Sequence, residues 1–85
     1  MSAEKVVVDI DALYAADGTA RLARLEHYKA EARRLAGEGN DVVLTGGGPI
    51  WLYLAVAHAL HGVARKLIYR SPVAGDVVIF DHSPD

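Results

Sequence analysis

Residues 41–51 read DVVLTGGGPIW, and this stretch decides how the chain folds. Its first five residues form a short apolar segment rich in β-branched side chains, which is typical of a buried strand. Three glycines then turn the chain. Pro49 suits the first turn of a helix, because its missing N–H would have no partner there. We therefore predict a strand over Asp41–Thr45, a glycine turn, and a helix from Pro49 to about His61.

The sequence before this unit predicts a second strand and a second helix. A continuous β-branched run favours a buried strand over Val6–Ile10, and a turn region follows over Asp11–Gly18. We expect a helix from about Thr19 to about Ala36, because apolar residues recur there at helical spacing. These apolar residues are Leu22, Leu25, Ala32 and Leu35.

Two further strands are predicted after the second helix, over Lys66–Tyr69 and Val77–Phe80. The residues between them, Ser71–Gly75, are few enough for an antiparallel hairpin. The predicted order is therefore β-α-β-α-β-β, an α/β fold with a small open sheet and a C-terminal antiparallel hairpin. Strand-helix-strand units imply parallel pairing with right-handed crossovers. With 85 residues, the chain is expected to form a single α/β domain over residues 1–85.

The amino-acid composition indicates which kinds of partner the domain can have. Hydrophobic residues make up 52% of the chain. A small domain has little interior in which to bury them, so we expect apolar surface committed to a second subunit and hence a homo-oligomer. The net charge is −2. Binding to duplex nucleic acid depends on a basic surface, so we expect no duplex nucleic acid as a partner.

The chain has no cysteine, which excludes a disulfide framework, a thiolate zinc site and a cysteine nucleophile. The first residues are too acidic for a signal peptide. The longest apolar stretch, Pro49–Leu60, is too short to span a bilayer. We therefore expect a cytoplasmic protein without a membrane partner.

The glycine turn is the strongest candidate for a ligand site. A strand that ends at Thr45, followed by Gly46, Gly47, Gly48 and a helix start, presents free N–H groups and the positive end of a helix dipole. Phosphate groups suit such a site. Trp51 follows and could stack on a base. The alternatives are a tight turn with no ligand and a tryptophan that serves packing. The turn lacks the lysine of a P-loop.

Three histidines are candidates for chemistry. His58 and His61 lie three residues apart on the predicted helix and share a face, and His82 follows the last strand. Imidazoles can act as acid or base near neutral pH. The alternatives are one buried and one exposed helical histidine, with His82 in a solvated chain end. A histidine pair without further ligands is an incomplete metal site, so the metal ligands stay unknown.

The run from Val42 to Leu52, followed by Ala57 and His58, resembles a CRISPR-associated family, the Csx-three-type ring nucleases. The hallmark of that family is a strand, the motif G-R-G-P-I-W-L, and a helix that carries A-H. The similarity continues into Tyr69, Gly75–Val78 and Asp81-His82-Ser83. It covers roughly the C-terminal half of the chain.

The resemblance implies a ferredoxin-like α/β fold and subunits that assemble into dimers and tetramers. It implies cyclic tetra-adenylate as the ligand, gripped between assembled subunits. It further implies cleavage of that cyclic oligoadenylate by a phosphodiesterase activity, a hydrolase reaction linked to Mn²⁺. Degrading this messenger switches off type III CRISPR antiviral signalling.

The chain departs from the family pattern at two functional positions. Gly47 stands where the family has an arginine, and Arg70 stands where it has an aspartate. His58 and His82 match, and His61 lies close to a second family histidine. Loss of the aspartate weakens metal-assisted cleavage more than nucleotide binding.

Three hypotheses remain. In a ring nuclease, His58 or His61 would be the base, His82 the acid, and the turn amides with Arg70 would stabilise charge. The alternatives are a non-catalytic cyclic-oligoadenylate-binding or sequestering module and a purely structural subunit. At the turn itself, Gly47→Val is expected to abolish binding through bulk and lost backbone freedom.

Overall fold

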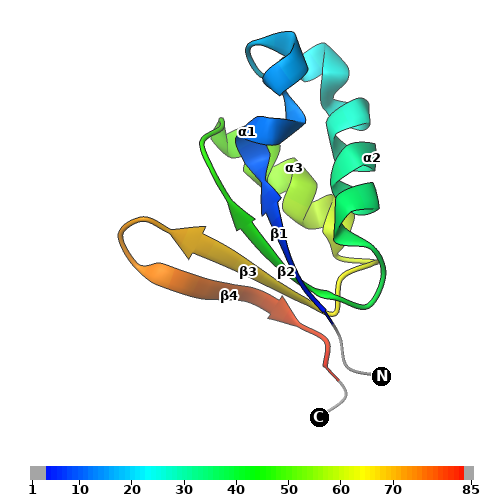
Figure 1. Ribbon diagram of the computed structural model, residues 1–85, viewed down its shortest axis with the longest axis vertical. Coiled ribbons are helices and arrows are strands. Elements are labelled where there is room, and N and C mark those ends of the chain that lie inside the picture. The colour runs from blue at the N-terminus through cyan, green and yellow to red at the C-terminus, as the bar shows by residue number, and fades with distance from the viewer. Residues whose placement is uncertain (1–3, 84–85) are drawn as a thin grey trace.

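The Val-rich segments predicted as strands form one sheet in a computed structural model that describes residues 4–83. The strands are β1 (Lys5–Asp9), β2 (Asp41–Thr45), β3 (Lys66–Ser71) and β4 (Gly75–Asp81). They lie in the order β1-β2-β3-β4. The first three are parallel and β4 returns antiparallel to β3 (Figure 1).

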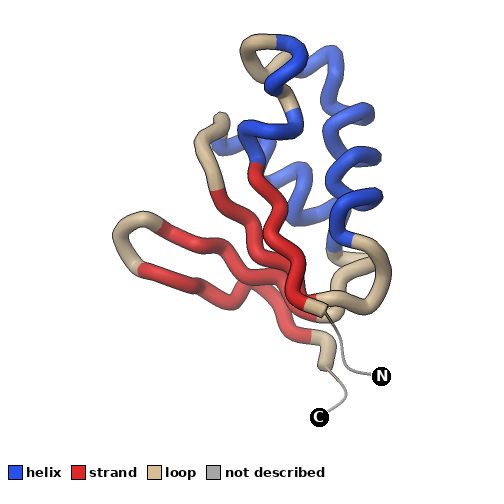
Figure 2. Tube along the Cα trace, viewed as in Figure 1, coloured by secondary structure: helices blue, strands red, loops and turns tan. Residues whose placement is uncertain are grey.

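Helices connect the parallel strands. The short helix α1 (Ile10–Leu13) follows β1, and α2 (Leu25–Ala36) and α3 (Ile50–Leu60) form the two crossovers, preceded by 3₁₀ turns at Ala15–Asp17 and Leu22–Arg24. Both crossover helices lie on the same side of the sheet (Figures 1 and 2). Among residues 4–83, no helix lies on the opposite side of the sheet (Figure 1).

The core lies between the sheet and these two helices. The strands contribute Val8, Val42, Leu44 and Leu67, and the helices contribute Tyr28, Ala32, Leu52, Val56 and Leu60. Tyr28 is fully buried, and its hydroxyl donates a hydrogen bond of 2.6 Å to the Asp17 carboxylate. The hydroxyl group of the buried Tyr28 therefore has a hydrogen-bond partner, as buried tyrosines usually do.

The predicted α/β class, element order and C-terminal antiparallel hairpin are confirmed. Ferredoxin-like domains have the order β-α-β-β-α-β. This chain places both helical crossovers before its hairpin, which is why three neighbouring strands run parallel.

The upstream helix begins later than predicted, at Leu25 instead of Thr19. Asp17, a natural cap for an early start, accepts a hydrogen bond from the Tyr28 hydroxyl instead. Leu22 consequently lies in a 3₁₀ turn and is 69% exposed. The expected turn region over Asp11–Gly18 contains most of α1 and a 3₁₀ turn.

The strand β4 is the most exposed strand of the sheet: of its seven residues only Phe80 is half-buried, and it packs against the core. A bulge opposite Leu67 and Ile68 adds Ile79 to the strand, and Val77, Val78 and Ile79 are all exposed. In the described part of the chain, no helix has the length and apolarity needed to cross a bilayer.

Candidate functional site

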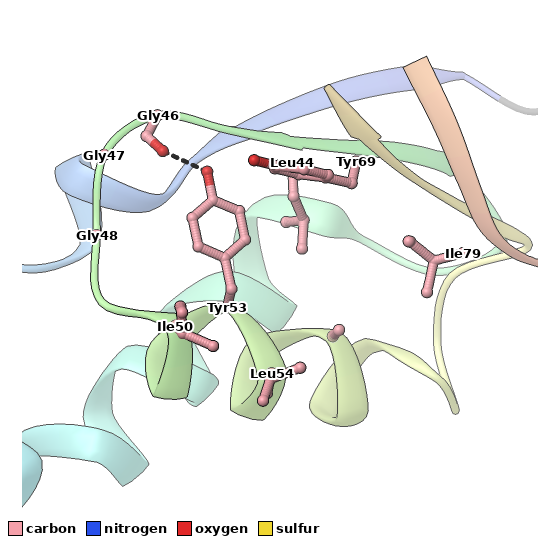
Figure 3. A pocket seen from close by; sticks show the side chains of 10 residues that line it. Leu44, Gly46, Gly47, Gly48, Ile50, Tyr53, Leu54, Tyr69 and Ile79 are labelled. Carbon is pink, nitrogen blue, oxygen red and sulfur yellow. Dashed lines mark hydrogen bonds between the residues drawn. The ribbon is translucent and has the colours of Figure 1, made fainter. Parts of the chain in front are cut away.

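The glycine turn is held in place by two tyrosines. The Tyr14 hydroxyl, just after α1, donates a hydrogen bond of 2.8 Å to the Gly47 carbonyl oxygen. The Tyr53 hydroxyl, on α3, donates one to the Gly46 carbonyl oxygen (Figure 3). Gly46 has a φ of +94°, whereas the φ of Gly47 is not positive. The backbone freedom expected at Gly47 is therefore needed at Gly46, and Gly47 has open space around it.

The amides of this turn are available to a ligand. Within residues 4–83, the N–H groups of Gly46, Gly47 and Gly48 donate no hydrogen bond. They lie immediately before Pro49, the N-cap of α3. Unpaired amides at a helix start are suited to anions, because the helix dipole favours negative charge there.

The fold brings most of the predicted ligand-binding residues into one hollow. This glycine-end hollow, with a volume of about 390 Å³, is lined by Thr45, Gly46, Gly47, Tyr53, Tyr69, Arg70 and Pro72. An adjoining apolar pocket of about 440 Å³ lies between α3 and the β3–β4 hairpin, and Gly48 lines it together with Leu44, Leu54 and Ile79 (Figure 3). Trp51 lines neither.

Arg70 does not carry an uncompensated charge. Its Nε and Nη2 atoms donate to the Asp76 carboxylate at 3.0 and 3.4 Å. These hydrogen bonds lower the pKa of Asp76 and raise the pKa of Arg70. A ligand phosphate would have to compete with Asp76 for the guanidinium.

Two carboxylates beside the turn were not predicted from the sequence. A Cβ on Gly46 would clash with Oδ1 of Asp9 and with Oδ1 of Asp11. The sequence did contain a signal for them, because Asp9 and Asp11 follow a predicted strand and the carboxyl ends of the parallel strands β1 and β2 meet at one edge of the sheet. No group of three or more metal-ligating side chains occurs in residues 4–83. Two carboxylates still fit Mg²⁺ or Mn²⁺, which are often held by one or two carboxylates plus ligand phosphates.

The predicted histidines lie at the other end of the sheet. The Nε2 atoms of His61, just after α3, and His82, just after β4, are 3.1 Å apart. The ring of Phe80 stacks on His82 and meets His61 edge-on. His58 is exposed one turn earlier, and among the described residues its side chain makes no hydrogen bond or ring contact. Two of the three histidines are therefore brought together.

The glycine turn and the histidine pair are separated by the length of α3. An 11-residue helix is about 16 Å long at about 1.5 Å per residue. A candidate site lies at each end of this helix. We call the region around Gly46–Gly48 the glycine end and the region around His61 and His82 the histidine end. A single phosphate group cannot contact both.

Comparison with known proteins places the chain in a family. A family model described as "CRISPR-associated protein (Cas_csx3)" matches residues 20–85. An uncharacterized protein of Aquifex aeolicus (strain VF5) is 39% identical over 44 residues, which are 52% of this chain and 40% of that protein. The match thus spans less than half of that relative, and no solved structure matches the chain. The match over residues 20–85 shows that the chain belongs to the Cas_csx3 family of CRISPR-associated proteins.

Proposed function

We propose that the domain binds a cyclic oligoadenylate, cyclic tetra-adenylate, at the glycine end as part of CRISPR-related defence. The observation that carries this proposal is the set of unpaired amides of Gly46–Gly48 at the start of α3. These donors suit a phosphate diester, and family membership supplies the CRISPR context.

The surroundings of the turn suit a nucleoside next to that phosphate. Tyr53 and Tyr69 line both the glycine-end hollow and the apolar pocket. Their rings meet edge-to-face with centroids 5.3 Å apart. Purine bases bind to aromatic and apolar surfaces. A phosphate on the turn would therefore have a site for its base within the same hollow.

Negative charge beside the turn leads us to propose that a cation binds together with the ligand. The carboxylates of Asp9 and Asp11 flank Gly46 and would repel a bare phosphate. A divalent cation between these carboxylates and the phosphate would remove that repulsion. We therefore expect ring binding to strengthen when Mn²⁺ or Mg²⁺ is added, and Asp9→Asn with Asp11→Asn to abolish that dependence.

Gly47 offers a direct test with a matched pair of variants. Its Cβ position is open, so a side chain there leaves the fold intact. Gly47→Arg adds a positive charge beside the turn, and we expect it to tighten binding of cyclic tetra-adenylate about tenfold in calorimetric titration at low salt. Gly47→Glu should weaken binding by a similar factor. Equal affinity for both variants would place the ligand elsewhere.

Cleavage of the ring is a second candidate function, favoured by the His61–His82 pair. The two Nε2 atoms are close enough to share one proton, and in that state the imidazolium would be the acid and the neutral imidazole the base. A ribose 2′-hydroxyl would attack the adjacent phosphorus, one imidazole would take its proton, and the other would protonate the departing 5′ oxygen. RNA carries its own nucleophile for this step.

Chromatography separates the two functions. The protein is incubated with cyclic tetra-adenylate, with and without Mn²⁺, and the nucleotide is resolved by size and charge. Linear product supports cleavage, and intact ring that co-elutes with the protein supports binding alone. If no nucleotide is bound or cleaved, both proposals are wrong and the domain has a structural role.

A further inference from the structure

Arg70 and Asp76 face each other across the β3–β4 hairpin. The two residues are direct partners in the strand register. The Arg70 guanidinium donates to the carboxylate of Asp76 from Nε at 3.0 Å and from Nη2 at 3.4 Å. The tip of this hairpin stands apart from the helices (Figure 1). The pair is therefore open to solvent, and its side chains are 43% and 44% exposed.

The arginine of this pair reaches the candidate ligand site. Arg70 lines the glycine-end hollow together with Gly46 and Gly47, whereas Asp76 is not one of the described residues that line it. The volume of the hollow, about 390 Å³, lies in the range of pockets for small ligands. A guanidinium beside unpaired backbone amides offers donors for a second anion. The Asp76 carboxylate thus holds the donors that a ligand phosphate would use.

We propose that the Arg70–Asp76 pair is an exchangeable anion site, in which a phosphate diester of the ligand displaces the Asp76 carboxylate from the Arg70 guanidinium. The exchange rests on the proposed function: the turn amides bind one phosphate, and Arg70 binds the next phosphate along the nucleotide chain. Both contacts form within one complex, so the second one adds to the first. The site therefore favours ligands with two or more phosphates over a single nucleotide.

Charge explains why the carboxylate has to leave. Asp76 uses Nε and Nη2 of Arg70, which leaves Nη1 without a partner among the described residues. The neighbouring carboxylate nevertheless cancels the positive charge and would repel a phosphate bound at Nη1. Asp9 and Asp11 already add negative charge beside Gly46. A free Arg70 therefore attracts a phosphate more strongly than a paired one.

The surroundings of the pair keep the cost of the exchange small. Exposed ion pairs contribute little to stability, so loss of this one should lower ligand affinity by no more than about fivefold. The hydrogen bond from Arg70 is the main cause of the lowered pKa of Asp76, and the charge of Lys5 is a further cause. A positive charge thus remains near the carboxylate after Arg70 has left. The new contacts between Arg70 and phosphate are charge-assisted and offset the loss.

The backbone of the hairpin turn is fixed, so the exchange is confined to side chains. The Ser71 hydroxyl oxygen accepts hydrogen bonds from the amides of Val73 and Ala74, at 3.1 and 3.0 Å. Gly75 follows with a φ of +75°, a backbone conformation that glycine adopts without strain. Exposed side chains change rotamer within nanoseconds. Arg70 can therefore leave Asp76 while the hairpin stays closed.

Arg34 provides an internal control for the movement of Arg70. Its Nε donates to Glu31 at 3.0 Å, as that of Arg70 does to Asp76, but it lies on α2, away from the hollow. The arginine Nε–H signals are followed by NMR while cyclic tetra-adenylate is added, and Arg70→Ala assigns the Arg70 signal. We expect the Arg70 signal to shift as the ring binds and the Arg34 signal to stay. A ring that binds without moving the Arg70 signal would overturn the exchange.

Matched variants test whether Asp76 competes with the ligand. Asp76→Asn and Glu31→Gln each remove one negative charge from an arginine pair and keep the shape of the side chain. In calorimetric titration with cyclic tetra-adenylate at low salt, Asp76→Asn should tighten binding about fivefold and Glu31→Gln should change it less than about twofold. Arg70→Ala should weaken binding about tenfold. Unchanged or weaker binding by Asp76→Asn would overturn the exchange, and weaker binding would show that the carboxylate orients Arg70.

Inorganic phosphate separates this anion site from the proposed function. In the same NMR titration with phosphate in place of the nucleotide, Asp76→Asn should reach half of its Arg70 shift at a phosphate concentration about fivefold lower than the parent protein. If phosphate behaves in this way and the ring does not bind, the anion site stands and the proposed function is wrong. An Arg70 signal that phosphate moves equally in both proteins, or in neither, would overturn the exchange. Circular dichroism checks that the variants are folded.

Discussion

The glycine end and the histidine end of the sheet differ in the kind of functional group that they present. At the glycine end the functional groups are backbone amides, fixed by hydrogen bonds from Tyr14 and Tyr53 to the turn carbonyls. At the histidine end they are the exposed side chains of His61 and His82. A backbone site cannot be altered without altering the local fold, whereas a side-chain site can be removed alone. Substitutions at the two ends should therefore differ in kind.

The helix α3 connects the two ends, so its packing should matter to both. Leu60 is fully buried against the sheet, whereas Leu54 on the same helix is 67% exposed. Leu60→Ala is expected to lower the free energy of unfolding by about 2–5 kcal/mol, because it leaves a cavity in the core. Leu54→Ala should change it by no more than about 0.5 kcal/mol. Urea denaturation measures both, and equal losses would contradict the packing described for α3.

The histidine pair gives the sharpest functional separation. If cleavage occurs there, His61→Ala and His82→Ala should each lower the cleavage rate about a hundredfold, and the double variant little further, because the pair acts as a unit. His58→Ala should have a smaller effect, since His58 is exposed and outside the pair. Ring binding should persist in all of them. If His61→Ala loses ring binding, the glycine end and the histidine end would form one binding site, contrary to this prediction.

Neighbouring glycines test the backbone nature of the glycine end. Gly46→Ala should destabilise the domain by about 1–2 kcal/mol from its left-handed backbone alone. It should also disturb the turn, because the new methyl group would meet the carboxylates of Asp9 and Asp11. Gly47→Ala should be neutral within about 0.5 kcal/mol. Thermal unfolding compares them, and equal melting temperatures would show that the turn relaxes freely.

The smallest expected effect concerns how strongly acid lowers the stability of the fold, and it compares one ion pair at each end. Arg65 donates two hydrogen bonds to Asp41 at the histidine end, at 2.9 and 3.1 Å, and hydrogen bonding from Arg65 is the largest cause that lowers the pKa of Asp41. A carboxyl whose folded pKa lies below its unfolded value of about 3.9 stabilises the fold above that pH, and this stability is lost as the pH falls through the folded pKa.

Removal of that carboxyl should therefore flatten the acid limb of the stability curve. We expect the melting temperature of Asp41→Asn to fall less steeply than that of the parent between about pH 5 and pH 2. Asp76→Asn, at the glycine end, should change the slope less, since the Arg70–Asp76 pair is 43% and 44% exposed against 37% and 26% for Arg65–Asp41. The reverse order would contradict this ranking of the two pairs.

The amino-acid sequence alone determined the order of the elements and the start of α3. Alternation of apolar runs, the glycines at Gly46–Gly48 and Pro49 are local signals, and they act on residues next to one another in the chain. The hairpin between β3 and β4 was predictable for the same reason. The later start of α2 was not, because it depends on a hydrogen bond between Asp17 and Tyr28, which lie 11 residues apart.

Only the tertiary structure decided which candidate residues share a site. His58 and Gly48 belong to the same short stretch of sequence, yet α3 carries them towards opposite ends of the sheet, because a helix rises about 1.5 Å with every residue. Parallel pairing of β1 with β2 places Asp9 and Asp11 against Gly46, far from it in sequence. The hairpin likewise pairs Arg70 with Asp76 and brings His82 back to His61. Distance along the chain does not fix distance in space; strand order and helix length do.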